Sequence, residues 1–253
     1  MNKLHLAALP LILFLLAFFY APLAVLAYYS IIEEDGGYGL DNYIELFRDP
    51  AYLKVVLYSV AIAGQTTLAT LLLSLPAAYY IAIHSRGPEK AALLVAMITP
   101  FWIDFLLRAL AIKNIMYLLD LREGYASMMA GMVYDYLPYM FLPVYASLSG
   151  IRESLLQAAR ALGAGPLHIA TKIILPLALP GIVAGSILVF LMSMTEYVIP
   201  ALLGGTQGFT IGTLIYYLFL SGDKWGQGSA LTLLITTTLL IATLILSRRR
   251  TIQ

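Results

Sequence analysis

The chain contains no cysteine and only three histidines among its 253 residues. Without cysteine it can form no disulfide, no thiolate metal site and no cysteine nucleophile. The histidines, His5, His84 and His168, lie too far apart along the sequence for the ligand spacing of a zinc site. The dipeptide Gly-Lys is also absent, so the chain carries no phosphate-binding P-loop. We therefore expect no cofactor on this chain, and any use of ATP would need a partner protein.

Charge is scarce as well. Charged residues make up 11% of the chain and hydrophobic residues 61%, and the formal net charge is +1. Soluble proteins average about 25% charged residues. A chain of this composition cannot cover its surface with polar groups, so we expect much of it to face membrane lipid. The longest basic run, Arg248–Arg250, is too short to indicate a nucleic-acid partner.

Long apolar runs take the place of the missing charge. A membrane-spanning helix needs about 20 apolar residues, and six stretches of the sequence approach or exceed that length. We therefore predict an all-α membrane protein with six transmembrane helices. A cleaved signal peptide is the alternative for the first stretch, whose length favours a retained helix. The six stretches are Leu6–Ser30, Val55–Ile83, Ala91–Leu110, Ala126–Leu148, Gly181–Ala201 and Ser229–Ser247.

Lysine and arginine predict the orientation of these helices. Six spans place both termini on one side, and nine of the fifteen basic residues, including Lys3, fall on that side. Basic loops tend to stay in the cytoplasm, so we predict a multi-pass protein of the cell membrane with both termini in the cytoplasm. We divide the chain into an N-terminal helix with an outer loop (1–52), a membrane domain (53–247) and a cytoplasmic tail (248–253).

One charged segment, Gln157–Pro180, lies between the fourth and fifth predicted spans. The residues from Glu153 to Leu162 that lead into it are good helix formers. Gly163 and Gly165 allow a tight turn, and a second short helix is predicted over Leu167–Leu175, stopped by Pro176 and Pro180. We call residues 153–180 the elbow. It is either an ordinary amphipathic segment at the membrane surface or a docking surface for a partner.

The spacing of residues in the elbow resembles that of the permease subunits of binding-protein-dependent ABC importers, of the type I, MetI-like class. Their cytoplasmic loop carries Glu-Ala-Ala, three residues, Gly, nine residues and Ile-x-Leu-Pro. This chain has Gln157-Ala158-Ala159, Gly163 and Ile173-Ile174-Leu175-Pro176 at those spacings, and only Gln157 departs from the pattern. The resemblance implies that this coupling helix docks on an ATPase subunit. It also implies that Ala158, Ala159 and Gly163 pack closely there, while Glu153 is a candidate for the missing carboxylate.

Other segments resemble the spermidine/putrescine branch of this family. They include Thr99–Trp102, Tyr139–Tyr145 and Leu202–Gly205. Permeases for ferric iron and thiamine share part of the pattern. The resemblance implies a non-catalytic subunit that moves a small solute, such as a polyamine, into the cytoplasm. It also implies ATPase subunits, a second permease subunit that forms a heterodimer with this one, and an extracytoplasmic solute-binding protein as partners, with membrane lipid around the helices.

Three carboxylates fall inside predicted spans. A charged side chain at the centre of the bilayer costs about 2.5–3.5 kcal/mol on insertion scales, so each carboxylate needs a partner or a wet cavity. Asp104 and Arg108, four residues apart, are predicted to pair on one helix. Asp135 and Glu196 have tyrosines beside them, which suits an organic cation. The alternatives are that they bond to backbone freed by prolines or face a partner subunit. The candidate substrate path therefore comprises Asp104, Tyr134, Asp135, Glu196 and Tyr197.

Two other classes of function remain open from the sequence. A cation-coupled secondary transporter would use Asp135 and Glu196 as carriers and would work without a partner ATPase. A membrane-embedded enzyme would need a convergent set of catalytic side chains, which the sequence does not show. Neither accounts for the spacing within the elbow.

Overall fold

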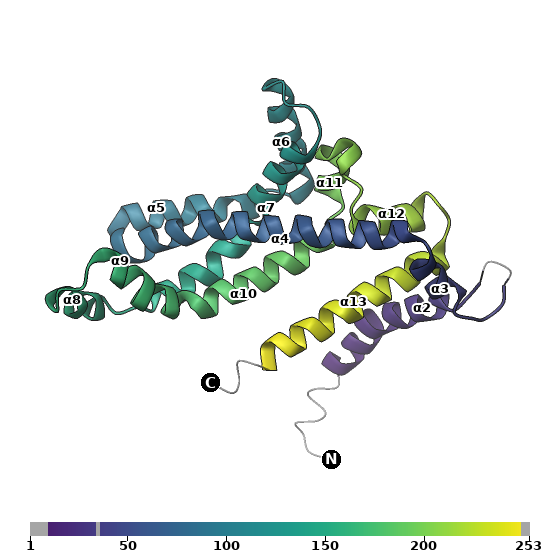
Figure 1. The fold of residues 1–253 in the computed structure, drawn as a ribbon, viewed down its shortest axis with the longest axis horizontal. Helices are drawn as coiled ribbons and strands as arrows, with labels where there is room; N and C mark the ends of the chain where they lie inside the picture. The colour runs from purple at the N-terminus through teal and green to yellow at the C-terminus, as the bar shows by residue number, and fades with distance from the viewer. Residues whose placement is uncertain (1–9, 34–35, 249–253) are drawn as a thin grey trace, which may run out of the picture. The chain divides into compact units, whose positions relative to one another are not determined.

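The computed structural model describes residues 10–33 and 36–248, with side chains described as far as residue 244. Within these ranges the chain is helical, apart from turns and one isolated bridge between Ile32 and Tyr38. Figure 1 traces the helices in chain order. The chain forms two compact units, residues 1–54 with 214–253, and residues 55–213. Two helices, α4 (Pro50–Tyr79) and α12 (Ile211–Leu220), contain the boundaries between the units.

The first unit is built on two long helices. The N-terminal helix runs from Pro10 to Ser30, with a π-helical segment η1 (Leu16–Tyr20) before α2 (Ala21–Ser30). It packs along α13 (Trp225–Arg248). The short helix α3 (Asp41–Arg48) lies between α2 and α4 in the chain and also contacts α13. The predicted outer loop, within residues 1–52, thus contains a short helix, α3.

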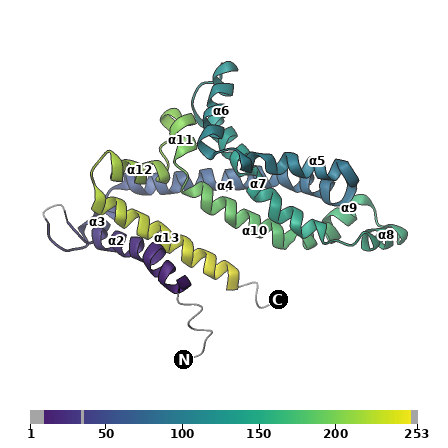
Figure 2. The same cartoon turned by 180° about the vertical axis from the view of Figure 1, so that it is seen from behind.

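The second unit contains most of the remaining helices. Its centre is the packing of α10 on α7, which lie side by side in both views (Figures 1 and 2). Buried side chains of α7, among them Met132, Met140, Phe141 and Leu148, form much of the core. The helices are η2 (Tyr80–His84), α5 (Gly87–Ile98), η3 (Thr99–Trp102), α6 (Phe105–Leu118), α7 (Tyr125–Ser149), α8 (Glu153–Ala161), α9 (Pro166–Ile169), η4 (Ala170–Ile174), α10 (Leu175–Met194), α11 (Val198–Leu203) and η5 (Gly205–Gln207).

Glycines allow α7 and α10 to approach closely. A Cβ atom on Gly181 would lie 2.2 Å from the carbonyl oxygen of Pro143, and one on Gly185 would lie 2.9 Å from the sulfur of Met140. The two glycines are four residues apart, the small-xxx-small spacing that lets membrane helices pack backbone against backbone. The contact between α7 and α10 therefore depends on the absence of side chains at these positions.

The structure supports four long spans, with a fifth if a bent pair of helices counts as one. The four helices long and apolar enough to cross a membrane are Pro10–Ser30, Pro50–His84, Pro166–Met194 and Trp225–Leu244. The predicted fourth span, Ala126–Leu148, coincides with α7 but is not among them. Its tyrosines, two prolines and buried Asp135 make α7 less apolar than the other long helices.

The predicted third span, Ala91–Leu110, is not one straight helix. Helix α5 with η3 and helix α6 form a pair bent by 101°. Pro100 lies in the 3₁₀ turn η3, and Asp104 then caps the N-terminus of α6 by accepting hydrogen bonds from the amides of Leu106 and Leu107. Proline and a capping carboxylate are both start signals for a new helix, which is why the chain turns here.

The prediction that Pro176 and Pro180 stop a short second helix of the elbow is wrong. The chain remains helical from Pro166 to Met194, so the span that was predicted to begin at Gly181 begins earlier. The π-helical segment η4 precedes these prolines, and Pro176 lies in the first turn of α10. Local π adjustments re-satisfy backbone groups that proline leaves free in membrane helices, so the helix continues.

Candidate functional site

The first arm of the elbow is an exposed helix. Helix α8 begins at Glu153, as predicted, and ends with Leu162 as its C-cap. Gly163 follows at a φ of +83°, the left-handed region that favours glycine. Its N–H donates to the carbonyl of Arg160, and the N–H of Ala164 donates to the carbonyl of Ala159, each at 3.0 Å. These two bonds form a Schellman motif, so Gly163 is required by the backbone itself.

The apolar residues of the elbow divide between its two sides. Leu156 and Ile169 are buried against the rest of the second unit. Leu162 and Leu167, in contrast, are 89% and 76% exposed, and Leu155 is 45% exposed. Exposed leucines interleaved with Arg152, Arg160 and other polar residues are typical of a surface that a partner protein or the membrane interface covers. We call the exposed residues Leu155, Ala158, Leu162 and Leu167 the elbow surface.

The predicted coupling residues do not all lie on this surface. Gln157, Ala158 and Gly163 are exposed on the first arm, and Ala159 is half-buried. A Cβ atom on Gly163 would meet no atom within 4 Å, so the space beside it is open. Ile173 packs partly into the core, while Leu175 and Pro176 are exposed where α10 begins. The second half of the motif thus belongs to the long helix that leads into the membrane.

Glu153 is already engaged within the chain. Its carboxylate oxygen Oε1 accepts a bond from Nη2 of Arg86 at 2.7 Å, and the side-chain amide of Gln157 lies 3.4 Å from the same oxygen. Arg86 precedes α5, so this ion pair joins α8 to the turn between η2 and α5. A pocket of about 560 Å³ is lined by residues around the start of α8, among them Arg152 and Leu155, and by residues of α7 and α10, among them Leu177.

Breaking this ion pair should have a small effect, because both side chains are exposed. Arg86→Gln and Glu153→Gln should each lower the stability of the purified protein by about 0.2–1 kcal/mol. The double variant should be no less stable than either single variant, since the pair is lost only once. Thermal unfolding of the three variants measures this. A much larger loss in one single variant would show that the residue has another partner.

A second group of polar residues lies within the second unit, three of them buried and one half-buried. We call Arg108 of α6, Asp135 and Tyr136 of α7, and Glu196 after α10 the buried charge cluster. Nη2 of Arg108 lies 2.9 Å from Oδ1 of Asp135, with both side chains nearly inaccessible. The hydroxyl of Tyr136 donates to Oε2 of Glu196 at 2.6 Å. Oε1 of Glu196 accepts from the amides of Val198 and Ile199, at the start of α11.

This arrangement corrects the sequence prediction. Arg108 pairs with Asp135 across two helices rather than with Asp104, so the predicted Asp104–Arg108 pair is wrong. Asp104 is exposed and caps α6. Tyr134 is 41% exposed whereas Asp135 is buried, so the two side chains leave different faces of α7. Tyr197 is 43% exposed and is likewise outside the cluster.

Aromatic rings that the sequence analysis did not select lie beside the buried charge cluster. The ring centroids of Tyr136 and Tyr139 are 6.0 Å apart, and those of Tyr139 and Phe101 are 4.7 Å apart. Tyr139 is three residues from Tyr136 on α7, and this spacing was a signal that could have found it. Arg108 and Phe101 come from other segments, and their proximity to α7 is a tertiary contact with no local signature.

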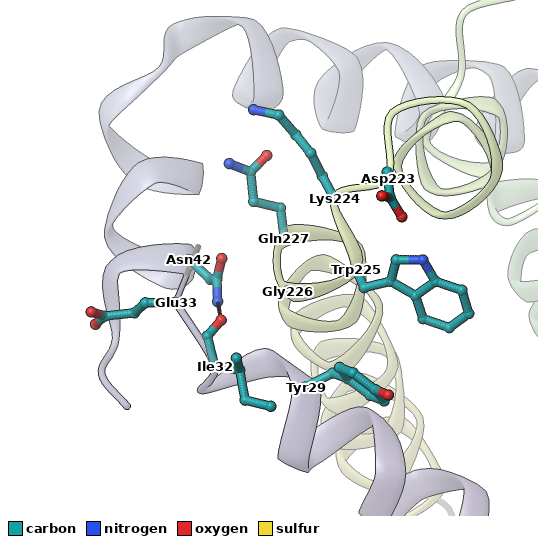
Figure 3. Close-up of a pocket in the computed structure, with 9 residues that line it drawn as sticks. All are labelled: Tyr29, Ile32, Glu33, Asn42, Asp223, Lys224, Trp225, Gly226 and Gln227. Atoms are coloured by element: carbon teal, nitrogen blue, oxygen red, sulfur yellow. Dashed lines mark hydrogen bonds between the residues drawn. The ribbon is translucent and has the colours of Figure 1, made fainter. Parts of the chain in front are cut away.

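The first unit has a pocket of its own, of about 340 Å³ (Figure 3). The rings of Tyr29 and Trp225 lie 5.7 Å apart at this pocket. The side-chain amide of Asn42 donates to the carbonyls of Ser30 and Ile32, as Figure 3 shows for Ile32. The side chain of Gln227 accepts from Tyr52 and donates to Glu45. These bonds join α2, α3 and α13, so the lining side chains hold the unit together.

Comparison with known proteins places these features in context. A sequence model of the family described as "Binding-protein-dependent transport system inner membrane component" matches residues 50–250. The spermidine/putrescine transport system permease protein PotB of Escherichia coli is 34% identical over 220 residues, which cover 78% of this chain and 77% of PotB. PotB of Haemophilus influenzae is 34% identical over 224 residues, 81% of this chain and 77% of its own.

The fold also matches solved structures. A chain of a bacterial ABC transporter that imports the acidic polysaccharide alginate has a TM-score of 0.74 at 19% identity, covering 98% of this chain and 96% of that one. A second structure, of the alginate transporter in complex with an alginate-bound periplasmic protein, has a TM-score of 0.73 at 18% identity, covering 96% and 91%. At this level of identity the likeness concerns the fold.

Proposed function

The chain belongs to the family of binding-protein-dependent transport system inner membrane components and is a permease subunit of an ABC importer, and we propose that it moves a polyamine such as spermidine or putrescine. Subunits of this kind are non-catalytic membrane components, so ATP hydrolysis belongs to partner subunits. The 34% identity to PotB over most of both chains is the observation that carries the proposal of a polyamine substrate. The same permease role for ferric iron or thiamine is the alternative.

The proposed path for the substrate runs past the buried charge cluster. One arginine against two carboxylates leaves one net negative charge among these residues, and tyrosine rings lie beside them. Negative charge with aromatic faces is the chemistry that receives an organic ammonium group. Within the predicted path this supports Glu196 as the contact for the substrate, while Asp135 is paired with Arg108. The cap of α6 accounts for Asp104, and the exposure of Tyr134 and Tyr197 sets them apart from the cluster.

We propose six spans with both termini in the cytoplasm. The four long apolar helices, the bent pair of α5 and α6 counted as one span, and α7 together supply six crossings. The excess of lysine and arginine at one set of helix ends supports the orientation. Lys3 and most of the predicted tail, residues 249–253, lie outside the described residues. The family match over residues 50–250 supports the predicted permease domain of residues 53–247 after the N-terminal region 1–52.

The elbow is the proposed site at which this subunit couples to its ATPase. Its exposed leucines supply apolar area for a partner, and the Schellman turn at Gly163 gives the first arm a fixed end. Helix α9 and η4 continue without a break into α10, so a push on the elbow would be carried along one rigid helix into the membrane. Gln157 makes this contact without the charge that a glutamate would bring.

Further partners follow from the same assignment. We propose that an extracytoplasmic solute-binding protein delivers the substrate, which the alginate transporter in complex with its periplasmic protein supports by analogy of fold. We also propose a second permease subunit, and a heterodimer rather than a pair of identical chains. The chain is similar both to PotB and to PotC, two differently named permease proteins of spermidine/putrescine transport systems.

Competition for uptake tests the substrate. The complete complex, with its ATPase, second permease and binding protein, is reconstituted in liposomes and supplied with labelled spermidine. An excess of unlabelled putrescine should reduce uptake strongly, whereas ferric iron, thiamine and an amino acid should leave it unchanged. Uptake of thiamine or iron with no uptake of either polyamine would contradict the proposed substrate while leaving the role of a permease subunit intact.

A further inference from the structure

Arg108 is buried in a part of the membrane domain where an arginine is costly. It is 5% exposed and its partner Asp135 is 3% exposed. A buried charge persists only when it is paired, and Asp135 is the one carboxylate that pairs with Arg108 among the described residues. The two residues therefore cancel each other's charge, and neither is available to a substrate as an uncompensated charge.

The geometry of the pair points to charge rather than hydrogen bonding as its role. Nη2 of Arg108 lies 2.9 Å from Oδ1 of Asp135. Among the described residues, however, Nε and Nη1 of Arg108 find no hydrogen-bond partner, and Oδ1 receives no aligned hydrogen bond. An arginine that recognises a carboxylate by hydrogen bonding usually donates two parallel N–H···O bonds to it. Here only one nitrogen approaches, so a lysine could supply the same charge.

Glu196 differs from Asp135 because no lysine or arginine in the described part of the chain pairs with it. It receives hydrogen bonds from the hydroxyl of Tyr136 and from the amides of Val198 and Ile199, which fix its position. None of these donors carries a full positive charge. Glu196 is therefore the one carboxylate of the cluster whose charge remains to be balanced, and it is half-buried rather than enclosed.

We propose that Arg108 is a specificity-determining residue that neutralises Asp135 and so limits the buried charge cluster to a single uncompensated carboxylate, Glu196. The cluster then receives one ammonium group of a substrate at a time, with the rings of Tyr136 and Tyr139 beside the rest of the amine. This inference rests on the proposed polyamine substrate. The second charge of putrescine, or the second and third of spermidine, must find their partners elsewhere along the path.

Charge-balanced variants test this role. Arg108→Gln leaves two uncompensated carboxylates and Asp135→Asn leaves an unpaired arginine, whereas the double variant Arg108→Gln/Asp135→Asn and the single variant Arg108→Lys both keep one net negative charge. Uptake by the reconstituted complex is measured for butylamine, putrescine and spermidine, which carry one, two and three positive charges. Copurification with the ATPase and thermal unfolding report assembly independently.

Each single variant that unbalances the charge should lose at least about tenfold in uptake, because it leaves a buried charge unpaired. The double variant and Arg108→Lys should transport within about threefold of the unmodified protein and keep its order of KM among the three amines. Arg108→Gln should shift that order, so that KM falls most for the amine of highest charge. If Arg108 only stabilised the fold, Arg108→Gln would not change the order of KM among the three amines.

Three results separate the inference from the function on which it rests. An assembled double variant as inactive as the single variants would overturn the role of Arg108 as a charge balance. So would an order of KM that does not change in Arg108→Gln. If either unbalanced variant fails to assemble, the double variant and Arg108→Lys still decide the matter. An unmodified complex that moves none of the three amines would instead refute the polyamine substrate.

Discussion

Replacing Leu162 with glutamate should separate this subunit from its ATPase partner. Leu162 is the most exposed leucine of the elbow surface, at 89%. Burying a leucine against a partner contributes about 1.5–3 kcal/mol, and a glutamate in its place would add an unpaired charge to the interface. A combined loss of about 3 kcal/mol or more corresponds to at least about a hundredfold weaker association. Copurification of the ATPase from detergent-solubilised membranes measures this loss.

Gln157→Glu is the matched control for Leu162→Glu. It adds the same charge to the same helix, at an exposed position where a glutamate completes the motif. We expect it to retain the ATPase and to couple at least as well as the unmodified protein. If both variants retain the ATPase equally, the elbow surface is not part of the interface with the ATPase. Gly163 is a less suitable probe, because its φ of +83° means that a substitution strains the backbone before any partner is reached.

Gly181→Ala should destabilise the membrane domain. The added Cβ atom would lie 2.2 Å from the carbonyl oxygen of Pro143, a backbone atom that cannot move without shifting α7. Overpacking of this kind costs about 1–3 kcal/mol, sometimes more. A lower temperature of unfolding and less protein in the membrane are the expected results.

Gly64→Ala is the control for this prediction. Gly64 lies on the exposed side of α4, and a Cβ atom there would meet nothing within 4 Å. Because alanine is the better helix former, by about 1 kcal/mol, Gly64→Ala should leave stability unchanged or raise it. If both variants unfold at the same temperature, the close packing of α7 against α10 does not determine the stability of the domain.

Local backbone chemistry made much of the elbow predictable. The start of α8 at Glu153 and the turn at Gly163 follow from helix propensity and from the conformational freedom of glycine, both of which act within a few residues. The prediction that Pro176 and Pro180 end a helix was wrong because proline stops a helix in water but is tolerated in a membrane helix. The sequence around Pro176 does not reveal the π-helical segment that accommodates it.

The buried charge cluster could be predicted only in part. The cost of a charge in lipid singles out Asp135 and Glu196 from the sequence alone. The partner of Asp135, Arg108, is 27 positions away on another helix. The prediction instead paired Arg108 with Asp104, the carboxylate four residues away on the same predicted helix. Arg108 lies on α6, which begins after the bend at Pro100 and the cap at Asp104.

The dependence of uptake on ATP and on partner subunits tests the central claim most directly. Uptake of labelled spermidine is compared between liposomes that hold this chain alone and liposomes that hold the complete complex with its binding protein. Each is measured with and without ATP inside the liposomes. We predict uptake only by the complete complex with ATP, and its loss with Leu162→Glu. Uptake by this chain alone, driven by an ion gradient and indifferent to ATP, would contradict the account.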